Sequence, residues 1–105
     1  MDNLEKLLRS TLLYDVYKNL LTEKQKMYFE DYYFANLSLS EIANKYSVSR
    51  NAIYSQLTLL NEELEGFESK LKLLEKGQTR QNIIDKLKKN ADEKTLELLK
   101  KLEEI

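Results

Sequence analysis

The sequence predicts an all-α protein, and three observations support that fold class. The chain contains no proline and only two glycines, so little in it breaks a helix. Apolar residues recur at spacings of three and four over most of the 105 residues, which is the period of an amphipathic helix. No run of alternating apolar and polar residues bounded by turn residues predicts a strand.

The first half of the chain predicts three helices. The first covers residues 4–20, where apolar residues follow the three-and-four spacing. The second covers residues 23–35, and Thr22 and Gln25 have the spacing of a capping box at its start. Its many aromatic residues favour a small core over a platform for stacked bases. The third covers residues 39–46, with Ser38 as its N-cap.

The second half predicts one long helix and two shorter ones. From Arg50 the sequence carries no strong stop signal before Lys76, so the helix would be about 40 Å long. Gly77 then predicts its end, and further helices follow over residues 79–90 and from Asp92 onward. We expect a single helical domain over residues 1–105. Residues 1–63 would form its core, and residues 64–105 the long-helix extension and the C-terminal helices.

Residues 39–58 match the pattern of a helix-turn-helix motif. Ser47 stands in the turn where glycine is usual, which predicts a non-glycine residue with a positive φ angle. Ser49 is the predicted N-cap of the second helix of the motif. The positions that this motif buries are occupied by small or apolar residues: Ile42, Ala43, Val48, Ile53 and Leu57.

The start of the second motif helix supplies polar residues that could contact nucleic acid. Arg50 can bond guanine and Asn51 can bond adenine through paired hydrogen bonds. Ser49 and the helix N-terminus could hold a phosphate. The candidate nucleic-acid-binding residues are Ser49, Arg50, Asn51, Tyr54, Ser55 and Thr58.

The charge distribution argues against tight binding of duplex DNA by this motif. Residues 38–58 carry a net charge of +1, and residues 59–77 carry −2. Neutralisation of phosphates supplies most non-specific affinity for DNA, and this segment offers little of it. The motif is therefore interpreted either as a DNA-binding surface or as a mainly structural unit. A basic cluster over residues 80–89 fits a solvated outer face, or a small patch for RNA or an acidic protein.

A heptad pattern of apolar residues follows the long helix and needs a partner. The chain's own C-terminal helices or a second copy of the chain could cover this pattern, and we expect both to contribute within a homodimer. The predicted dimer or bundle seam consists of Leu57, Leu60, Leu64, Phe67, Leu71 and Leu74, and Ile53 begins the pattern.

The composition excludes several classes of function. The chain contains no histidine and no cysteine, which removes the usual general base, the cysteine nucleophile and the common zinc ligands. We expect no catalytic residue, no cofactor and no metal site, although a site made of carboxylates alone stays formally open. No apolar stretch is long enough to span a bilayer, and the first five residues do not resemble a signal peptide. A cytoplasmic protein without membrane insertion is expected.

Several segments in the same order resemble the bacterial YlxM family of helix-turn-helix proteins. They are residues 21–25, 32–33, 37–43, 48–54 and 64–71, so the resemblance covers about residues 10–75. The helix-turn-helix part is also similar to region 4 of sigma-70-type sigma factors, over a shorter length. This chain departs from other family members at Gln56, Thr58 and Asn61, where they often carry basic residues.

The resemblance implies a helical, dimerising protein without defined catalytic residues. Family members are typically encoded beside the signal recognition particle GTPase Ffh or its receptor FtsY. The resemblance therefore implies an accessory or regulatory role in that pathway, with the particle RNA, the Ffh GTPase or both as partners. The alternative is a transcriptional regulator that binds DNA as a dimer, and an enzyme is the least favoured class.

Overall fold

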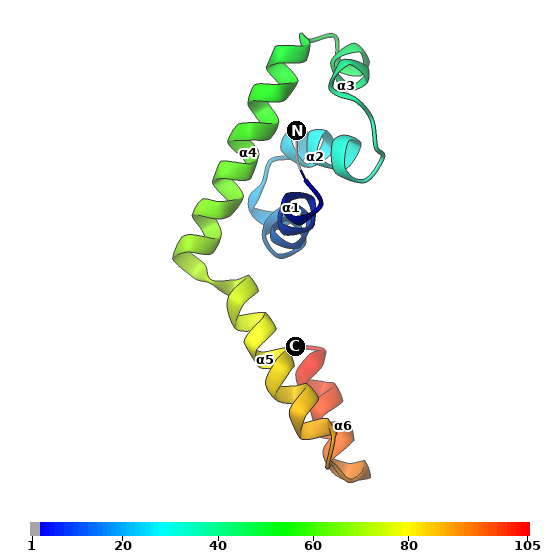
Figure 1. Ribbon diagram of the computed structural model, residues 1–105, viewed down its shortest axis with the longest axis vertical. Helices are drawn as coiled ribbons and strands as arrows, with labels where there is room; N and C mark the ends of the chain where they lie inside the picture. The colour runs from blue at the N-terminus through cyan, green and yellow to red at the C-terminus, as the bar shows by residue number, and fades with distance from the viewer. Residues whose placement is uncertain (1–2) are drawn as a thin grey trace. The chain divides into compact units, whose positions relative to one another are not determined.

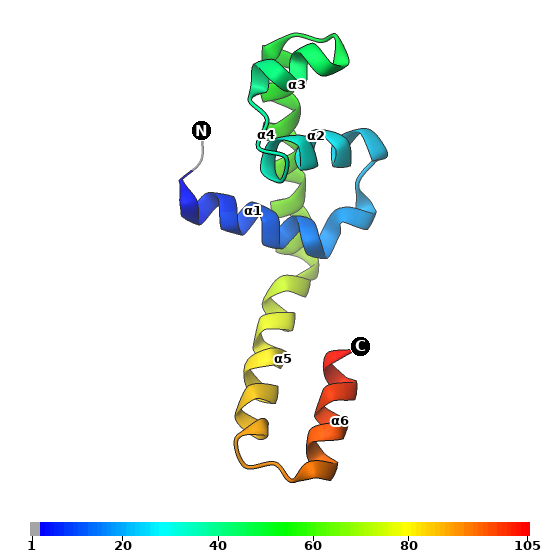
Figure 2. The same cartoon turned by 90° about the vertical axis from the view of Figure 1, so that its right-hand side faces the viewer.

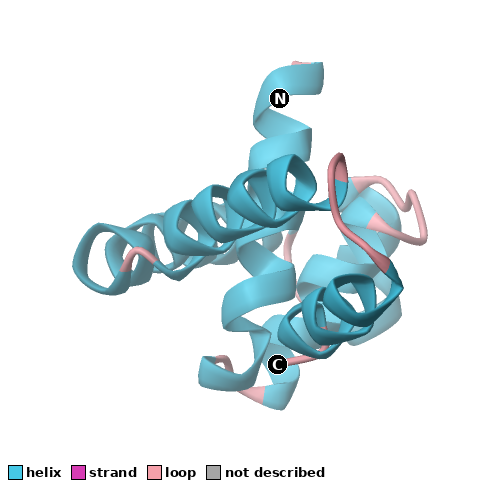
Figure 3. Ribbon diagram, turned by 90° about the horizontal axis from the view of Figure 1, so that it is seen from below, coloured by secondary structure: helices cyan, strands magenta, loops and turns pink. Residues whose placement is uncertain are grey.

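The computed structural model describes residues 3–105, so Met1 and Asp2 of the N-terminal stretch considered above lie outside it. The described residues form helices and loops without a strand, which confirms the all-α prediction (Figure 1, Figure 3). The elements are α1 (Leu4–Tyr17), the short 3₁₀ helix η1 (Lys18–Leu20), α2 (Glu23–Tyr33), α3 (Leu39–Tyr46), α4 (Arg50–Leu71), α5 (Leu73–Lys88) and α6 (Glu93–Glu103).

The chain divides into two compact units, Met1–Leu71 and Lys72–Ile105. The boundary lies at the break between α4 and α5. We call these unit 1 and unit 2 and describe each by itself. None of the described helices is both long and apolar enough to cross a membrane.

Unit 1 consists of α1, α2 and α3 packed against α4, and α1 crosses α4 in Figure 2. Its core is aromatic where α1 meets α2, because the rings of Tyr14 and Phe29 stack with their centroids 4.1 Å apart. Phe29 also stacks on Tyr33 at 4.2 Å. Tyr28 and Phe29 are buried, which confirms the core interpretation for them, whereas Phe34 at the end of the helix is exposed.

The predicted caps of α2 and α3 are present. The hydroxyl of Thr22 accepts from the amide of Gln25, whose side chain in turn accepts from the amide of Thr22. Ser38 and Glu41 form the same reciprocal pair at the start of α3. Each pair satisfies two backbone donors that a helix start leaves without partners. These caps fix where α2 and α3 begin.

Four predicted helix ends were wrong, and so was the predicted start at residue 79, because α5 begins at Leu73 and ends at Lys88. The first two helices are shorter than predicted, because α1 passes into η1 after Tyr17 and α2 ends at Tyr33. The long helix ends at Leu71, since Lys72 adopts the left-handed conformation with φ 54° and ψ 32°. Gly77 does not end a helix but lies inside α5, where an added Cβ would meet no atom within 4 Å. No feature of the local sequence marks Lys72 as the break.

Unit 2 is a hairpin in which α5 and α6 lie side by side and run in opposite directions (Figure 2). Asp92 caps α6 as predicted, and its side chain accepts from the amide of Thr95 at 2.8 Å. Ile84 of α5 and Leu99 of α6 are buried. Glu103 joins the two helices through an ion pair with Lys88 at 2.6 Å and a hydrogen bond from Gln81 at 2.9 Å.

Candidate nucleic-acid interface

The predicted turn of the helix-turn-helix motif is present between α3 and α4. Ser47 has φ 56° and ψ 44°, which confirms the positive φ predicted there. The amide of Val48 donates to the carbonyl of Ala43 at 3.0 Å, which closes the end of α3. The hydroxyl of Ser49 accepts from the amide of Ala52 at 3.0 Å and so caps α4. These local bonds set the direction in which α4 leaves the turn.

Packing beneath the turn holds α3 and α4 together. Ile42, Ala43, Ile53 and Leu57 are buried in one cluster with Tyr28 and Leu39, as predicted for four of the five positions. The prediction for Val48 was wrong, because its side chain is 38% exposed. The αL residue before it turns the chain outward, so Val48 adds little to this cluster.

All six candidate nucleic-acid-binding residues are exposed, and they do not gather in one hollow. Arg50, Asn51 and Tyr54 line an open depression of about 490 Å³ together with Leu39. Tyr54 and Thr58 line a second, larger depression of about 610 Å³ between α1 and α4. Tyr54 therefore stands between the two hollows, and Ser49 and Ser55 line neither of them.

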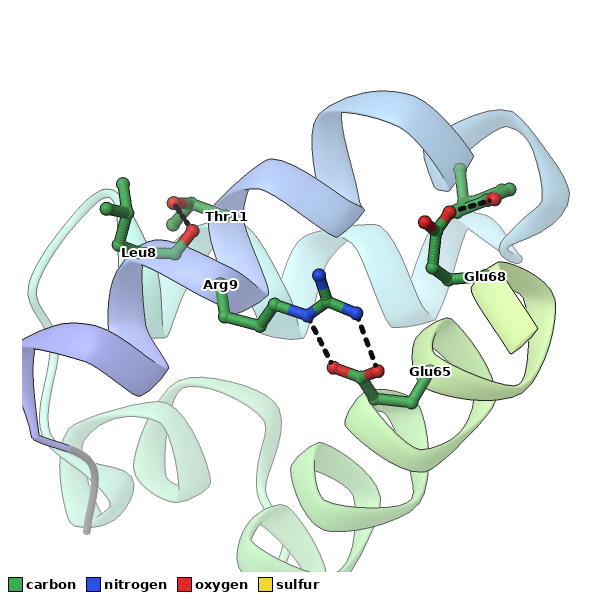
Figure 4. Close-up of polar contacts among 6 residues, drawn as sticks. Leu8, Arg9, Thr11, Glu65 and Glu68 are labelled. Carbon is green, nitrogen blue, oxygen red and sulfur yellow. Dashed lines mark hydrogen bonds and ion pairs between the residues drawn. The ribbon is translucent and has the colours of Figure 1, made fainter. Parts of the chain in front are cut away.

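The second depression contains residues that the sequence analysis did not single out. Lys6, Arg9 and Ser10 of α1 line it opposite Asn61, Glu62 and Glu65 of α4. Figure 4 shows the guanidinium of Arg9 bonded to both carboxylate oxygens of Glu65, at 2.9 and 3.1 Å. More than fifty positions separate these two residues along the chain, so no local motif predicts the pairing. The pair engages Arg9, whereas the structure shows no ion pair for Lys6, the other cation of α1 that lines this depression.

Lys45, the cation of α3, is also paired with a carboxylate. The Nζ of Lys45 lies 2.9 Å from Oδ1 of Asp31, and the hydroxyl of Tyr46 donates to Oδ2 of the same carboxylate at 2.6 Å. Burial alone would raise the pKa of Asp31, but the bonds from Tyr46 and Lys45 hold it below its usual value. Arg50, at the start of α4, is thus the one exposed cation within residues 38–58 for which the structure shows no ion pair.

The residues of the predicted seam have different environments. Leu57, Leu60 and Leu64 are at most 1% exposed in the single chain, so no second copy can contact them in this conformation. Phe67 packs its ring against that of Tyr17, with centroids 5.8 Å apart. Leu71 is exposed, and Leu74 is buried but belongs to α5 beyond the break at Lys72. The break at Lys72 separates Leu74 from the other five residues along the chain.

No group of three or more carboxylates that could hold a metal ion occurs among residues 3–105. The surface around the start of α4 thus offers polar side chains, one unpaired arginine and a capped helix N-terminus. These groups can donate to phosphates and to base edges.

Comparison with known proteins extends the resemblance to nearly the whole chain. Residues 4–105 match the model of family UPF0122, described as "Putative helix-turn-helix protein, YlxM / p13 like". A UPF0122 protein of Shouchella clausii (strain KSM-K16) is 48% identical over 86 residues, which cover 82% of this chain and 79% of that protein. A UPF0122 protein of Bacillus thuringiensis (strain Al Hakam) is 46% identical over 90 residues, covering 86% and 82% of the two chains.

Proposed function

The chain belongs to the UPF0122 family of YlxM/p13-like helix-turn-helix proteins, and we propose that it contacts nucleic acid through the start of α4 without carrying out catalysis. One observation carries this proposal: Arg50, Asn51 and Tyr54 project together from the first turns of a helix fixed by a buried core. A rigid helix that presents such residues at its N-terminus is how helix-turn-helix proteins reach base edges.

We propose that the nucleic acid is the RNA of the signal recognition particle, alone or together with the Ffh GTPase. The pathway comes from the family resemblance alone. The charge distribution is compatible with it, because unit 1 holds eight basic residues against eleven acidic ones. A surface with so little positive charge gains little from phosphates. A ribonucleoprotein target, in which a protein supplies part of the contact, suits this surface better than bare nucleic acid.

A regulatory role, a homodimeric state and a cytoplasmic location complete the proposal. The homodimer has to use a surface other than Leu57, Leu60 and Leu64, because the fold buries them. The regulatory role is tested by measuring the amount of Ffh–RNA complex with and without the protein. Sedimentation at several protein concentrations tests the homodimer, and cell fractionation tests the location.

A second candidate function is transcriptional regulation by binding duplex DNA. It is favoured by Arg50 and Asn51, whose side chains can pair with guanine and adenine in the major groove. A dimeric regulator would have to place its two α4 N-termini about 34–36 Å apart, or at a multiple of that distance, on one face.

A salt-titrated binding assay separates the two functions. The protein is titrated with the particle RNA and with genomic duplex fragments, each with and without Ffh. We expect selective binding of the RNA or of the RNA–Ffh complex, weakened by Arg50→Ala. Lys70→Ala, which removes a cation from the other end of α4, is the matched control. Tight, salt-sensitive binding of one duplex that requires Arg50 would establish the regulator instead. Binding of neither ligand would refute both candidates.

A further inference from the structure

The hairpin of unit 2 exposes a strip of aliphatic side chains. Ile83 and Leu87 on α5, with Leu98 and Leu102 on α6, are each between 46% and 61% exposed. The two members of each pair are four residues apart, so they lie one above the other on their helix. We call these four residues the hairpin strip.

Both pairs lie on the same side of the hairpin. On α5, Ile83 directly precedes the buried Ile84, and on α6, Leu98 directly precedes the buried Leu99. A step of one residue turns the side-chain direction by about 100° around the helix axis. The turn has the same sense in both helices when each is viewed from its own N-terminus. Because α5 and α6 run in opposite directions, this rotation brings both pairs to one face. That face carries an exposed apolar strip shared by the two helices.

Cations flank the strip. Lys76 and Arg80 lie seven residues before Ile83 and Leu87 on the same face of α5, and Lys94 lies one turn before Leu98 on α6. Lys101 follows Leu98 by three residues and extends the basic edge of α6. The structure shows no ion pair for any of these four cations; within residues 72–105, Lys88 is the cation paired with a carboxylate. Glu97 lies between Lys94 and Lys101 on that edge, so the edge carries two cations and one carboxylate.

The size of unit 2 indicates that this face needs a partner. Its 34 residues include no cysteine, and domains below about 40 residues usually need disulfides, metals or association to fold. Leu74, Ile84 and Leu99 are its buried apolar residues, while four aliphatic side chains of the strip stay half-exposed. A third helix laid along the strip would bury these groups in the manner of a helical bundle.

We propose that the hairpin strip binds an amphipathic helix of another protein, whose apolar stripe is flanked by carboxylates. The carboxylates would pair with Lys76, Arg80, Lys94 and Lys101, which supplies the charge complementarity of a specific interface. A second hairpin is a poorer fit, because two basic rims would face each other. A membrane is also a poorer fit, because unit 2 has no aromatic residue to anchor at the lipid interface. This proposal is independent of the contact made by α4, since no residue of unit 1 takes part.

The test uses the full chain and two synthetic peptides. Each peptide has three heptads with leucine at the core positions, and the flanking positions are glutamate in one and lysine in the other. Fluorescence anisotropy of the labelled peptides should show binding of the glutamate peptide, weakened by salt, and none of the lysine peptide. Arg80→Glu should weaken binding of the glutamate peptide and strengthen binding of the lysine peptide. Lys89→Glu, a change of the same charge on the opposite side of α5, should have little effect.

A matched pair of apolar variants tests the strip itself. Leu98→Ala should weaken binding of the glutamate peptide by about tenfold. Leu96→Ala, at a 42% exposed position on the other side of α6, should change it by less than about twofold. Circular dichroism verifies that each variant keeps its helices.

Equal binding of both peptides, binding of neither, or equal effects of Leu98→Ala and Leu96→Ala would overturn the proposal. Self-association of the chain that Leu98→Ala abolishes would assign the face to a second copy instead. Leu98-dependent binding to phosphatidylglycerol vesicles would assign it to a membrane.

Discussion

The hydroxyl of Tyr46 donates to a carboxylate oxygen of Asp31 over 2.6 Å, which ties the end of α3 to α2. Lys45 donates to the other oxygen of the same carboxylate at 2.9 Å. Asp31 thus holds α3, the first helix of the motif, against α2 and also pairs with Lys45, the cation of α3. This arrangement favours positioning of α3 over attraction of phosphates.

Replacement of Asp31 by asparagine should destabilise unit 1. The change removes the charge that strengthens both hydrogen bonds, so we expect a loss of about 1–2 kcal/mol in the free energy of unfolding. Urea unfolding at neutral pH measures it. Asp15→Asn is the control, because the Asp15 side chain is 83% exposed and its nearest cation is 4.0 Å away. A change at Asp31 no larger than that at Asp15 would show that the contacts contribute nothing.

The contribution of Asp31 should also depend on pH. Its pKa is held below the ordinary value by the bonds from Tyr46 and Lys45, against the effect of burial. The stabilisation is therefore complete above the unfolded-state pKa of about 3.9 and is lost as the pH falls through the lower folded-state pKa. The difference in unfolding free energy between the wild-type chain and Asp31→Asn should shrink as the pH is lowered from 7 towards 2. A difference that stays constant with pH would contradict this assignment.

Truncation of two neighbouring leucines of α4 should change the free energy of unfolding by very different amounts. Leu60 is 1% exposed, so Leu60→Ala should cost about 2–5 kcal/mol through lost burial and the cavity left behind. Leu59 is 48% exposed, so Leu59→Ala should change stability by no more than about 0.5 kcal/mol. Chemical denaturation of both variants checks this pair. Similar losses for the two would mean that α4 packs with a different face.

The left-handed residue of the turn offers a stabilising change. Ser47→Gly should raise the free energy of unfolding by up to about 1 kcal/mol, because glycine adopts φ 56° without the Cβ conflict. Ser47→Val should lower it, since a β-branched residue is disfavoured there. Thermal unfolding of the two variants measures the order of their stabilities. The reverse order would exclude the left-handed turn at this position.

Much of the fold followed from local sequence signals. Thr22 with Gln25, Ser38 with Glu41, Ser49 and Asp92 marked the helix starts correctly, because a capping side chain bonds a backbone amide two or three residues away. The helix-turn-helix motif was equally local, down to the left-handed Ser47. Helix ends were harder to predict, since the break at Lys72 has no glycine, proline or cap to announce it.

The sequence by itself determined that the chain is helical, where every helix except α5 begins and which residues open α4 at the surface. Those properties depend on spacings within one or two helical turns. The tertiary structure alone decided that Leu60 and Leu64 are buried within the chain, and that Arg9 is paired with Glu65 beside the candidate surface. It also decided that four aliphatic side chains of the hairpin share one exposed face. These properties depend on which helices meet in space, and contacts between residues tens of positions apart leave no periodic trace in the sequence.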